Sequence, residues 1–414
     1  MGTDNMNAKI SNLTRRNFLR SAIIAPVGVA LTPTLIGKAA DAPADSAAAS
    51  TPVPTRKLGR SGREVSMLIF GGDMPAYSPE HLDVGWSLGV RYFDTASGYG
   101  NGNDELKVAA WLDKYPERRK DLFLVSKDHP RQGPEQLLTM IDQRLERCKT
   151  SYLDLYFIHG INPREYGEDS LNWPKSDAFK KVAEKLKSSG KVKMVGFSCH
   201  DDRAPQYLAA AAEGGFLDAI MVKYTPFYVK GGDFDKALDA CHNAGIGLVA
   251  MKTLRNAADV PKRLPEFDKL GLTTHQALLQ AVWSDPRISA VCNRMQNVDN
   301  IQSSVSAVRA YKGPLKIAQM ELLRDTMLAS RRAICPGCPS CSQQGAELEF
   351  AFGDISRYVM YYEQDGNLQA RDLYQKLTPA QRDASRADLA ALRDACHFKT
   401  DYPEIARRAE RYFA

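Results

Sequence analysis

The sequence predicts a (β/α)8 barrel with an N-terminal hairpin and a C-terminal α-helical extension. Short apolar runs of strand composition alternate with amphipathic helical runs eight times over about 250 residues, which is typical of this barrel. Polar side chains also follow several of the strand runs directly. A doubly wound open sheet is the alternative, but it is not expected to bring the ends of successive strands as close together.

The barrel is expected over residues 55–314. It begins with a hairpin at residues 56–65, where glycines mark the turn. The strand runs are Ser66–Phe70, Val90–Phe93, Leu122–Ser126, Leu153–Ile158, Lys193–Phe197, Ala219–Val222, Gly247–Ala250 and Ile288–Cys292. Helical runs between them include Glu80–Leu88, Glu135–Arg147, Ala178–Ser189, Phe234–Asn243 and Thr274–Ser284. Segment 160–177 has little periodicity, so we expect a loop over the barrel mouth there.

After Pro314 the apolar spacing is helical throughout, which predicts a separate helical module over residues 315–414. Its helical runs are Leu315–Ala333, Leu348–Gln364, Ala370–Leu377, Pro379–Asp394 and Tyr402–Phe413.

Composition and charge limit the class of protein. A hydrophobic fraction of 44% and 25% charged residues are ordinary for a globular protein, so 414 residues predict one large domain and a smaller one. The net charge is +6, with both signs interspersed and no run of like charge. This pattern does not indicate a nucleic-acid partner.

The N-terminal segment resembles a twin-arginine export signal. Arg15 and Arg16 are followed by Phe-Leu and by a weakly apolar run that is too short for a membrane span of about 20 residues. We therefore expect a signal peptide over residues 1–42, a flexible leader over residues 43–54, and a periplasmic protein exported in folded form by the Tat translocase. An uncleaved N-terminal anchor is the alternative.

Four polar residues lie at the ends of three successive strand runs: Asp94, Tyr99, Lys127 and His159. Because the carboxyl ends of the strands meet at one end of a barrel, we expect these side chains to lie close together. A phenol donates a proton near neutral pH more readily when its pKa falls from about 10, and a neighbouring ammonium lowers it. A carboxylate can hold that ammonium in place. The alternative is a structural ion pair beside a core histidine.

In this order and spacing, the four residues resemble the catalytic tetrad of the aldo-keto reductase superfamily, and the likeness extends over residues 56–310. The resemblance implies interconversion of a small-molecule carbonyl and alcohol by hydride transfer with a nicotinamide cofactor, NADP(H). It implies that Tyr99 donates the proton and that Lys127, paired with Asp94, lowers the pKa of Tyr99. It also implies that His159 hydrogen-bonds the carbonyl oxygen. No metal is needed for this step.

The positions that hold the cofactor in this family are altered here. Ser198 matches the serine that binds the nicotinamide carboxamide, but Cys199 stands where asparagine is usual. Met221 replaces a glutamine that contacts the same group, and Met251 replaces a tyrosine that stacks on the ring in many members. Together these changes argue against tight binding of NADP(H). The candidate cofactor-binding residues are Ser198, Cys199, Met221, Met251, Lys252 and Arg294.

Cys335, Cys338 and Cys341 form a C-x-x-C-x-x-C run, a spacing that lets several thiolates converge on one centre. The fourth cysteine of the bacterial ferredoxin pattern is missing, and Cys396 is the candidate replacement. We favour a [4Fe–4S] cluster on these four cysteines; zinc, with His397 as a further ligand, and disulfides are the alternatives. The region resembles helical, cysteine-bearing extensions of some aldo-keto reductase relatives.

The sequence therefore predicts a periplasmic oxidoreductase similar to aldo-keto reductases, with a cysteine-cluster module. The alternative is a non-catalytic or electron-transfer barrel that lost nicotinamide binding and acts through a metal centre with a redox partner protein. The complete tetrad favours the enzyme, whereas the altered cofactor positions favour the alternative.

Overall fold

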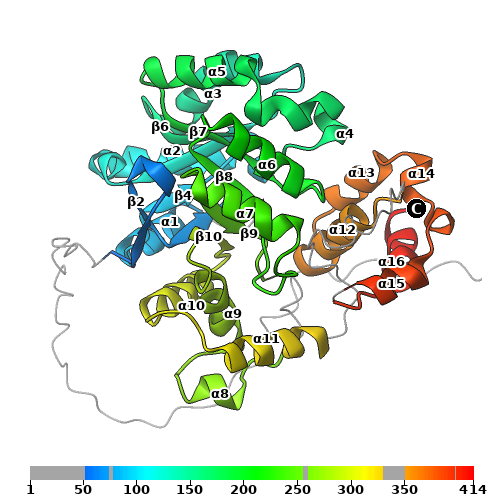
Figure 1. Cartoon of the computed structure of the whole chain (residues 1–414). Helices are drawn as coiled ribbons and strands as arrows, with labels where there is room; N and C mark the ends of the chain where they lie inside the picture. The colour runs from blue at the N-terminus through cyan, green and yellow to red at the C-terminus, as the bar shows by residue number, and fades with distance from the viewer. Residues whose placement is uncertain (1–51, 74–77, 255–259, 330–349, 397) are drawn as a thin grey trace, which may run out of the picture. The chain divides into compact units, whose positions relative to one another are not determined.

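Eight parallel strands close into a barrel in the computed structural model, which describes residues 52–73, 78–254, 260–329, 350–396 and 398–414 (Figure 1). The strands follow one another in chain order, and the last pairs with the first to complete the ring. They are β3 (Leu68–Gly71), β4 (Tyr92–Asp94), β5 (Phe123–Asp128), β6 (Leu153–Ile158), β7 (Val192–Cys199), β8 (Ala219–Lys223), β9 (Gly247–Met251) and β10 (Ile288–Arg294). The predicted barrel is confirmed, and the pairing of β10 with β3 excludes an open sheet.

The strands are buried on both faces, because successive side chains point alternately into the barrel and towards the helices. In β6, Leu155 and Phe157 belong to the apolar cluster that fills the barrel interior. Tyr156 and Ile158 belong to the larger cluster between the strands and the helices. The interior is thus packed with side chains, and only the ends of the barrel are free to form a site.

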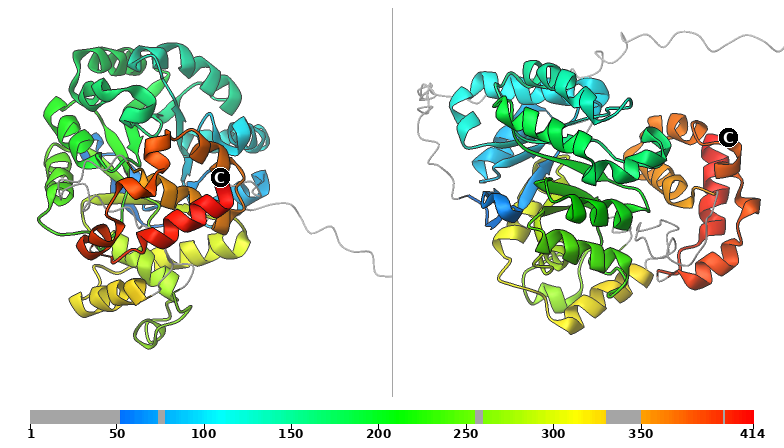
Figure 2. Two further views of the ribbon diagram at one scale, coloured as in Figure 1. Left: turned by 90° about the vertical axis from the view of Figure 1, so that its right-hand side faces the viewer. Right: turned by 45° about the horizontal axis from the view of Figure 1, so that its top comes forward.

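Helices surround the strands, as Figures 1 and 2 show. They are α1 (Pro79–Ser87), α2 (Asp104–Lys114), α3 (Leu137–Cys148), α5 (Asp177–Ser188), α6 (Ala204–Gly214), α7 (Asp233–Asn243), α9 (Thr274–Trp283) and α10 (Val298–Arg309). The helices predicted from sequence periodicity agree with these bounds to within two residues.

Helix α5 illustrates why these segments are helical. Ser176 caps its first turn by accepting a hydrogen bond from the backbone N–H of Phe179 at 3.2 Å. Phe179, Val182 and Leu186 recur at helical spacing and are buried against the sheet. The apolar stripe therefore fixes which face of the helix covers the barrel.

The predicted N-terminal hairpin closes the amino end of the barrel. Its strands are β1 (Thr55–Lys57) and β2 (Glu64–Ser66), and Leu58 in the turn is fully buried within the interior cluster. Gly59 has a φ of +52°, and a Cβ atom there would lie 2.3 Å from the carbonyl oxygen of Gly245. Only glycine permits this approach of the turn to the start of β9.

Two contacts anchor the chain around this hairpin. The Arg56 guanidinium donates hydrogen bonds to the carbonyl oxygens of Trp283 and Ile288, each at 2.7 Å. Just before β1, the backbone N–H of Val53 donates to the carbonyl oxygen of Gly89 at 3.1 Å, and the Val53 side chain is buried. Val53 and the hairpin are thus both fixed to the barrel.

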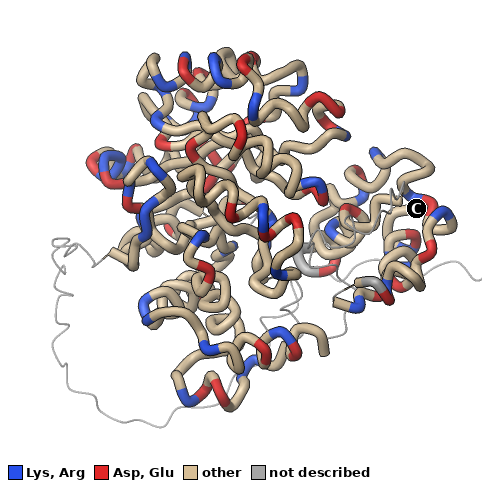
Figure 3. Tube along the Cα trace, in the orientation of Figure 1, with Lys and Arg blue, Asp and Glu red and all other residues tan. Residues whose placement is uncertain are grey.

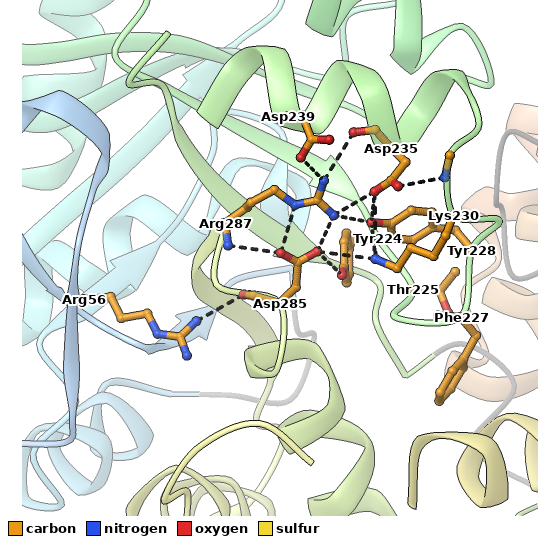
Figure 4. Close-up of polar contacts among 11 residues, drawn as sticks. Arg56, Tyr224, Thr225, Phe227, Tyr228, Lys230, Asp235, Asp239, Asp285 and Arg287 are labelled. Carbon is orange, nitrogen blue, oxygen red and sulfur yellow. Dashed lines mark hydrogen bonds and ion pairs between the residues drawn. The ribbon is translucent and has the colours of Figure 1, made fainter. Parts of the chain in front are cut away.

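A polar network joins the segment before β10 to α7 and to the loop after β8 (Figure 4). Arg287 binds Asp285 through two nitrogens, at 2.7 and 3.0 Å, and pairs with Asp235 at 2.9 Å and Asp239 at 2.6 Å. The Tyr224 hydroxyl donates to Asp285 at 2.9 Å. Because Asp285 is buried, its charge depends on these partners.

Segment 160–177 is not the irregular loop that its composition suggested. It forms two short helical segments, α4 (Pro163–Tyr166) and a 3-10 segment over Glu168–Lys175. Asn162 caps α4, and Pro163 fits its first position because that backbone nitrogen needs no partner. The 3-10 segment packs on α6, where the hydroxyls of Ser170 and Tyr207 lie 2.7 Å apart.

The C-terminal residues are helical, as predicted. The helices are α11 (Ile317–Ala329), α12 (Phe352–Asp365), α13 (Gln369–Gln375), α14 (Pro379–Arg382), α15 (Leu389–Ala395) and α16 (Tyr402–Phe413). Leu323 of α11 packs with Phe267 and Leu278 of the barrel, whereas the helices from α12 onward share an apolar cluster of their own.

The single helix predicted over Pro379–Asp394 is wrong. The segment is divided into α14, a 3-10 turn over Ala384–Arg386, and α15. Asp383 and Asp388 interrupt it because their side chains cap the next turns, accepting hydrogen bonds from backbone N–H groups.

Residues 1–51, which carry the predicted signal peptide and most of the leader, lie outside the described residues. Among the helices that the structure describes, none is long and apolar enough to cross a membrane. Basic and acidic residues are interspersed along the described chain (Figure 3).

Candidate active site

The structure brings the four predicted residues together at the carboxyl end of the barrel. Lys127 of β5 is fully buried, and its Nζ lies 2.7 and 2.8 Å from the two carboxylate oxygens of Asp94, at the end of β4. The same nitrogen donates to the carbonyl oxygen of Thr95 at 2.9 Å and to the hydroxyl of Tyr99 at 3.3 Å. The ammonium is therefore held between a carboxylate and a phenol.

Tyr99 and His159 approach this pair from two loops. Tyr99 begins a 3-10 turn after β4 and is half-buried. His159 directly follows β6, and its ring meets the Tyr99 ring edge-on, with centroids 5.2 Å apart. Gly72, after β3, lies against Asp94 and Tyr99: a Cβ atom there would be 2.6 Å from the carbonyl oxygen of Asp94 and 2.8 Å from Cδ2 of Tyr99.

The protonation states follow from burial. Burial raises the pKa of Asp94, although Lys127 opposes the shift. Burial, and secondarily the charge of Asp94, raises the pKa of Tyr99 well above 10. Burial lowers the pKa of His159 well below 6.5, and the neighbouring His129 adds to the effect. The site therefore presents a protonated phenol beside a neutral imidazole.

The pKa of Tyr99 is raised and not lowered, contrary to the effect expected of Lys127. A phenolate in this enclosed position loses hydration and faces the Asp94 carboxylate, and both effects favour the protonated form.

Sequence reasoning missed a second histidine behind His159. The rings of His129 and His159 are 4.5 Å apart, and Nδ1 of His129 lies 3.0 Å from Glu165 and 3.1 Å from the hydroxyl of Tyr166. That hydroxyl donates to the carbonyl oxygen of His159 at 2.7 Å. The position of His129, two residues after Lys127 at a strand end, was the available signal.

Of the candidate cofactor residues, Ser198 and Cys199 lie at the end of β7 and are buried. Ser198 Oγ accepts a hydrogen bond from the backbone N–H of Gly160 at 2.8 Å, and Cys199 Sγ lies 3.5 Å from the carbonyl oxygen of Ile161. Both side chains thus hold the loop after β6. The Ser198 hydroxyl keeps its own proton for donation.

The two methionines belong to the interior of the barrel. Met221, in the middle of β8, and Met251, at the carboxyl end of β9, are buried in the interior cluster. They provide apolar surface next to the site and no hydrogen bond for an amide.

Lys252 and Arg294 lie at the carboxyl ends of the adjacent strands β9 and β10. Arg294 donates to the carbonyl oxygen of Asp73 at 2.8 Å. Lys252 has a φ of +58°, and within the described residues no carboxylate forms an ion pair with it. Two neighbouring cations and the Ser198 hydroxyl fit a dinucleotide in charge and donor type, so these three residues are the candidates for holding NADP(H).

The predicted metal site is largely outside the described residues, because Cys335, Cys338 and Cys341 lie in segment 330–349. Cys396 is described: it is buried in the apolar cluster of the C-terminal helices, with Sγ 3.5 Å from Oγ1 of Thr400. In the part of the chain that the structure covers, no group of three or more His, Cys, Asp or Glu residues is arranged to hold a metal. The metal centre stays a prediction.

Comparison with known proteins gives one family. The model of the aldo/keto reductase family matches residues 75–312. Curated relatives include L-galactose dehydrogenase of Arabidopsis thaliana, which is 23% identical over 290 residues, 62% of this chain and 89% of the relative. Methylglyoxal reductase YeaE of Escherichia coli is 26% identical over 256 residues, 56% of this chain and 84% of the relative.

Solved structures show the same fold. Aldo-keto reductase AKR11C1 from Bacillus halodurans superposes with a TM-score of 0.52 at 22% identity, covering 66% of this chain and 96% of that chain. An aldo-keto reductase from Klebsiella pneumoniae in complex with NADPH gives a TM-score of 0.51 at 23% identity, covering 66% of this chain and 94% of that chain. Residues 313–414 lie beyond the family match.

Proposed function

Because the family model matches more than half of its length, the chain belongs to the aldo/keto reductase family, and we propose that it interconverts a small-molecule carbonyl and an alcohol with NADP(H). The observation that carries the proposal is the buried Lys127 ammonium between the Asp94 carboxylate and the Tyr99 hydroxyl. The relative solved with NADPH supports the choice of cofactor.

In this proposal Tyr99 is the general acid. Its raised pKa keeps the phenol protonated, and its oxygen accepts a hydrogen bond from Lys127, so its own proton points to another acceptor. The bound nicotinamide supplies the hydride. As the carbonyl oxygen gains negative charge, Tyr99 transfers its proton, and the Lys127 ammonium stabilises the phenolate that remains.

In this proposal His159 and Asp94 hold other groups in place for the reaction. The neutral imidazole of His159 hydrogen-bonds the carbonyl oxygen and orients it towards Tyr99. Asp94 fixes Lys127 and balances its charge in a buried setting.

The test is Tyr99→Phe in the full chain. We expect kcat for carbonyl reduction to fall by about 10²- to 10⁴-fold, because the proton donor is lost while the ring remains. NADPH binding, followed by fluorescence titration, and the far-UV circular dichroism spectrum should not change. Tyr152→Phe is the control, since Tyr152 stacks with Arg119 away from the site. Undiminished turnover by Tyr99→Phe would remove the mechanism.

The same titration tests the alternative of a barrel without an enzymatic role. Saturable binding of NADPH or NADH justifies a screen of aldehydes, ketones and sugars. Absence of binding in protein purified without cofactor would favour a non-catalytic or electron-transfer protein.

We also propose export through the twin-arginine pathway and a metal centre on Cys335, Cys338, Cys341 and Cys396, on the basis of the sequence motifs. Cys338→Ser should lower the iron or zinc content of anaerobically purified protein. Metal content equal to that of the unchanged protein would refute the centre.

A further inference from the structure

Helix α12 has a polar face beside its apolar one. Ile355 and Val359 pack into the apolar cluster shared with α16. Asp354, Arg357 and Tyr361 follow one another at intervals of three and four residues, so they share another face of the helix. This second face is half-buried and polar, and it contacts the barrel.

The polar face of α12 contacts loops at the carboxyl end of the barrel. Asp354 forms an ion pair with Arg164 of α4, after β6. A Cβ atom on Gly353 would lie 2.7 Å from the carboxylate of Asp202, after β7. On the next helix, Gln369 donates a hydrogen bond to Asn101, after β4. Helices α12 and α13 therefore border the end of the barrel that carries the proposed site.

Tyr361 and Arg357 lie close enough to the site to affect its charges. The Tyr361 ring centroid is 4.8 Å from Nζ of Lys252, at the end of β9. Tyr361 also contributes to the raised pKa of Tyr99. After burial, Arg357 is the strongest influence that lowers the pKa of His200, the residue following β7.

Among the described residues of this region, the positive charges exceed the carboxylates that pair with them. Arg164 and Arg357 share the single carboxylate of Asp354. Lys252 forms no ion pair with any described residue. By contrast, Lys223 is matched by Asp202 at 2.9 Å. Arg357 and Lys252 carry the excess positive charge.

Buried nitrogen atoms without hydrogen-bond partners occur at the same place. Among the described residues, Nε of Arg357 and Nδ1 of both His159 and His200 have none. Such groups are costly unless water or a ligand binds them. Together with the surplus charge, they indicate a site for an anionic, oxygen-rich group.

We propose that Arg357 and Lys252 bind a carboxylate carried by the substrate, so that the C-terminal module makes the enzyme selective for anionic carbonyl compounds. This inference rests on the proposed function, because it assigns the substrate class of that site. Lys252 is also a candidate for binding a phosphate of the cofactor, which has the same chemistry as a ligand, and the test separates the two.

The kinetic test compares 4-carboxybenzaldehyde with its neutral amide, 4-carbamoylbenzaldehyde, which has nearly the same shape and carries no charge. We expect kcat/KM of the unchanged protein to favour the carboxylate, and Arg357→Gln to lower the ratio of the two values by about 10- to 100-fold. Lys252→Asn should lower it in the same sense; asparagine tolerates the positive φ at this position. This second variant leaves the ion pairs of α12 intact.

Arg411→Gln is the matched control, because it removes an exposed arginine on α16 and should leave the ratio unchanged. A ratio near one in the unchanged protein, or one that neither site variant alters, would overturn the inference. A weaker Kd for NADPH in Arg357→Gln and Lys252→Asn with an unaltered ratio would overturn it too, and would assign the anion site to the cofactor.

A binding measurement separates this inference from the proposed function. Benzoate and benzamide are titrated into the full chain by calorimetry, with and without NADP+. Benzoate binding that Arg357→Gln abolishes would support the anion site even if no aldehyde is reduced, in which case only the proposed function fails. No preference for benzoate over benzamide would overturn the inference, whatever the turnover.

Discussion

Replacing Lys127 by methionine isolates the energetics of the buried ion pair. The lysine side chain is fully buried, and that of Asp94 is 2% exposed. Methionine approximates the length and apolar character of the lysine stem, so the cavity term is small. What remains is an Asp94 carboxylate enclosed without its cation.

Lys127→Met should lower the free energy of unfolding substantially, because the ion pair of Lys127 and Asp94 is buried. Removing one partner of such a pair costs about 3–5 kcal/mol, since the other charge stays buried and unpaired. The exposed pair of Lys175 and Glu213, at 3.0 Å, gives the contrast. Lys175→Met should change the free energy of unfolding by no more than about 1 kcal/mol.

The cost should depend on pH in a defined direction. Folding raises the pKa of Asp94, so the folded state binds this proton more tightly than the unfolded state does. Stability therefore falls as pH rises from the unfolded value, about 3.9, through the folded value. Without Lys127 the folded value is higher still, so the loss in Lys127→Met should be greater at pH 7.5 than at pH 5.

Urea unfolding followed by far-UV circular dichroism at these two pH values measures both effects. The double variant Lys127→Met, Asp94→Asn should recover much of the loss, because it removes the orphaned charge. A loss no larger than that of Lys175→Met, or an equal loss at both pH values, would refute the reasoning.

Three further predictions concern the site and its support. Gly72→Ala should lower kcat at least tenfold with little change in NADPH binding, because its Cβ would push Tyr99 out of place; wild-type kinetics would contradict this. Arg287→Met should lower the free energy of unfolding by about 3–5 kcal/mol in urea titrations, since the buried Asp285 would keep only Lys230, at 4.0 Å, as a cation. The ring of His159 should be neutral at pH 5.5 by histidine NMR, because folding lowers its pKa. The free energy of unfolding should therefore fall as pH falls below about 6.5, where the unfolded state binds a proton that the folded state does not. A charged ring at pH 5.5 would show the assignment to be wrong.

The sequence was sufficient where local pattern decides structure. Strand runs ending in polar residues placed Asp94, Lys127 and His159 at one end of the barrel, and the structure brings them together with Tyr99. Parallel strands in a closed barrel leave no other place for residues at their carboxyl ends.

The sequence was insufficient where distant segments meet. Tyr358, Tyr361 and Tyr362 recur at helical spacing, which predicts packing, and all three contact the apolar cluster of the C-terminal helices. Periodicity did not predict that Tyr361 also lies against Lys252, more than a hundred residues away. Periodicity shows that a face exists, and only tertiary packing shows what covers it. The pKa of Tyr99 was misjudged for the same reason, because burial comes from the whole fold.

The anchoring of Val53 and of the first hairpin sets a limit on removal of the proposed leader. Cleavage beyond Val53 would remove a buried side chain and its backbone hydrogen bond to Gly89. Loss of Leu58 would uncover the interior of the barrel. A peptidase that acts on the folded protein should therefore stop on the leader side of Val53, and N-terminal sequencing of the mature chain would reveal that boundary.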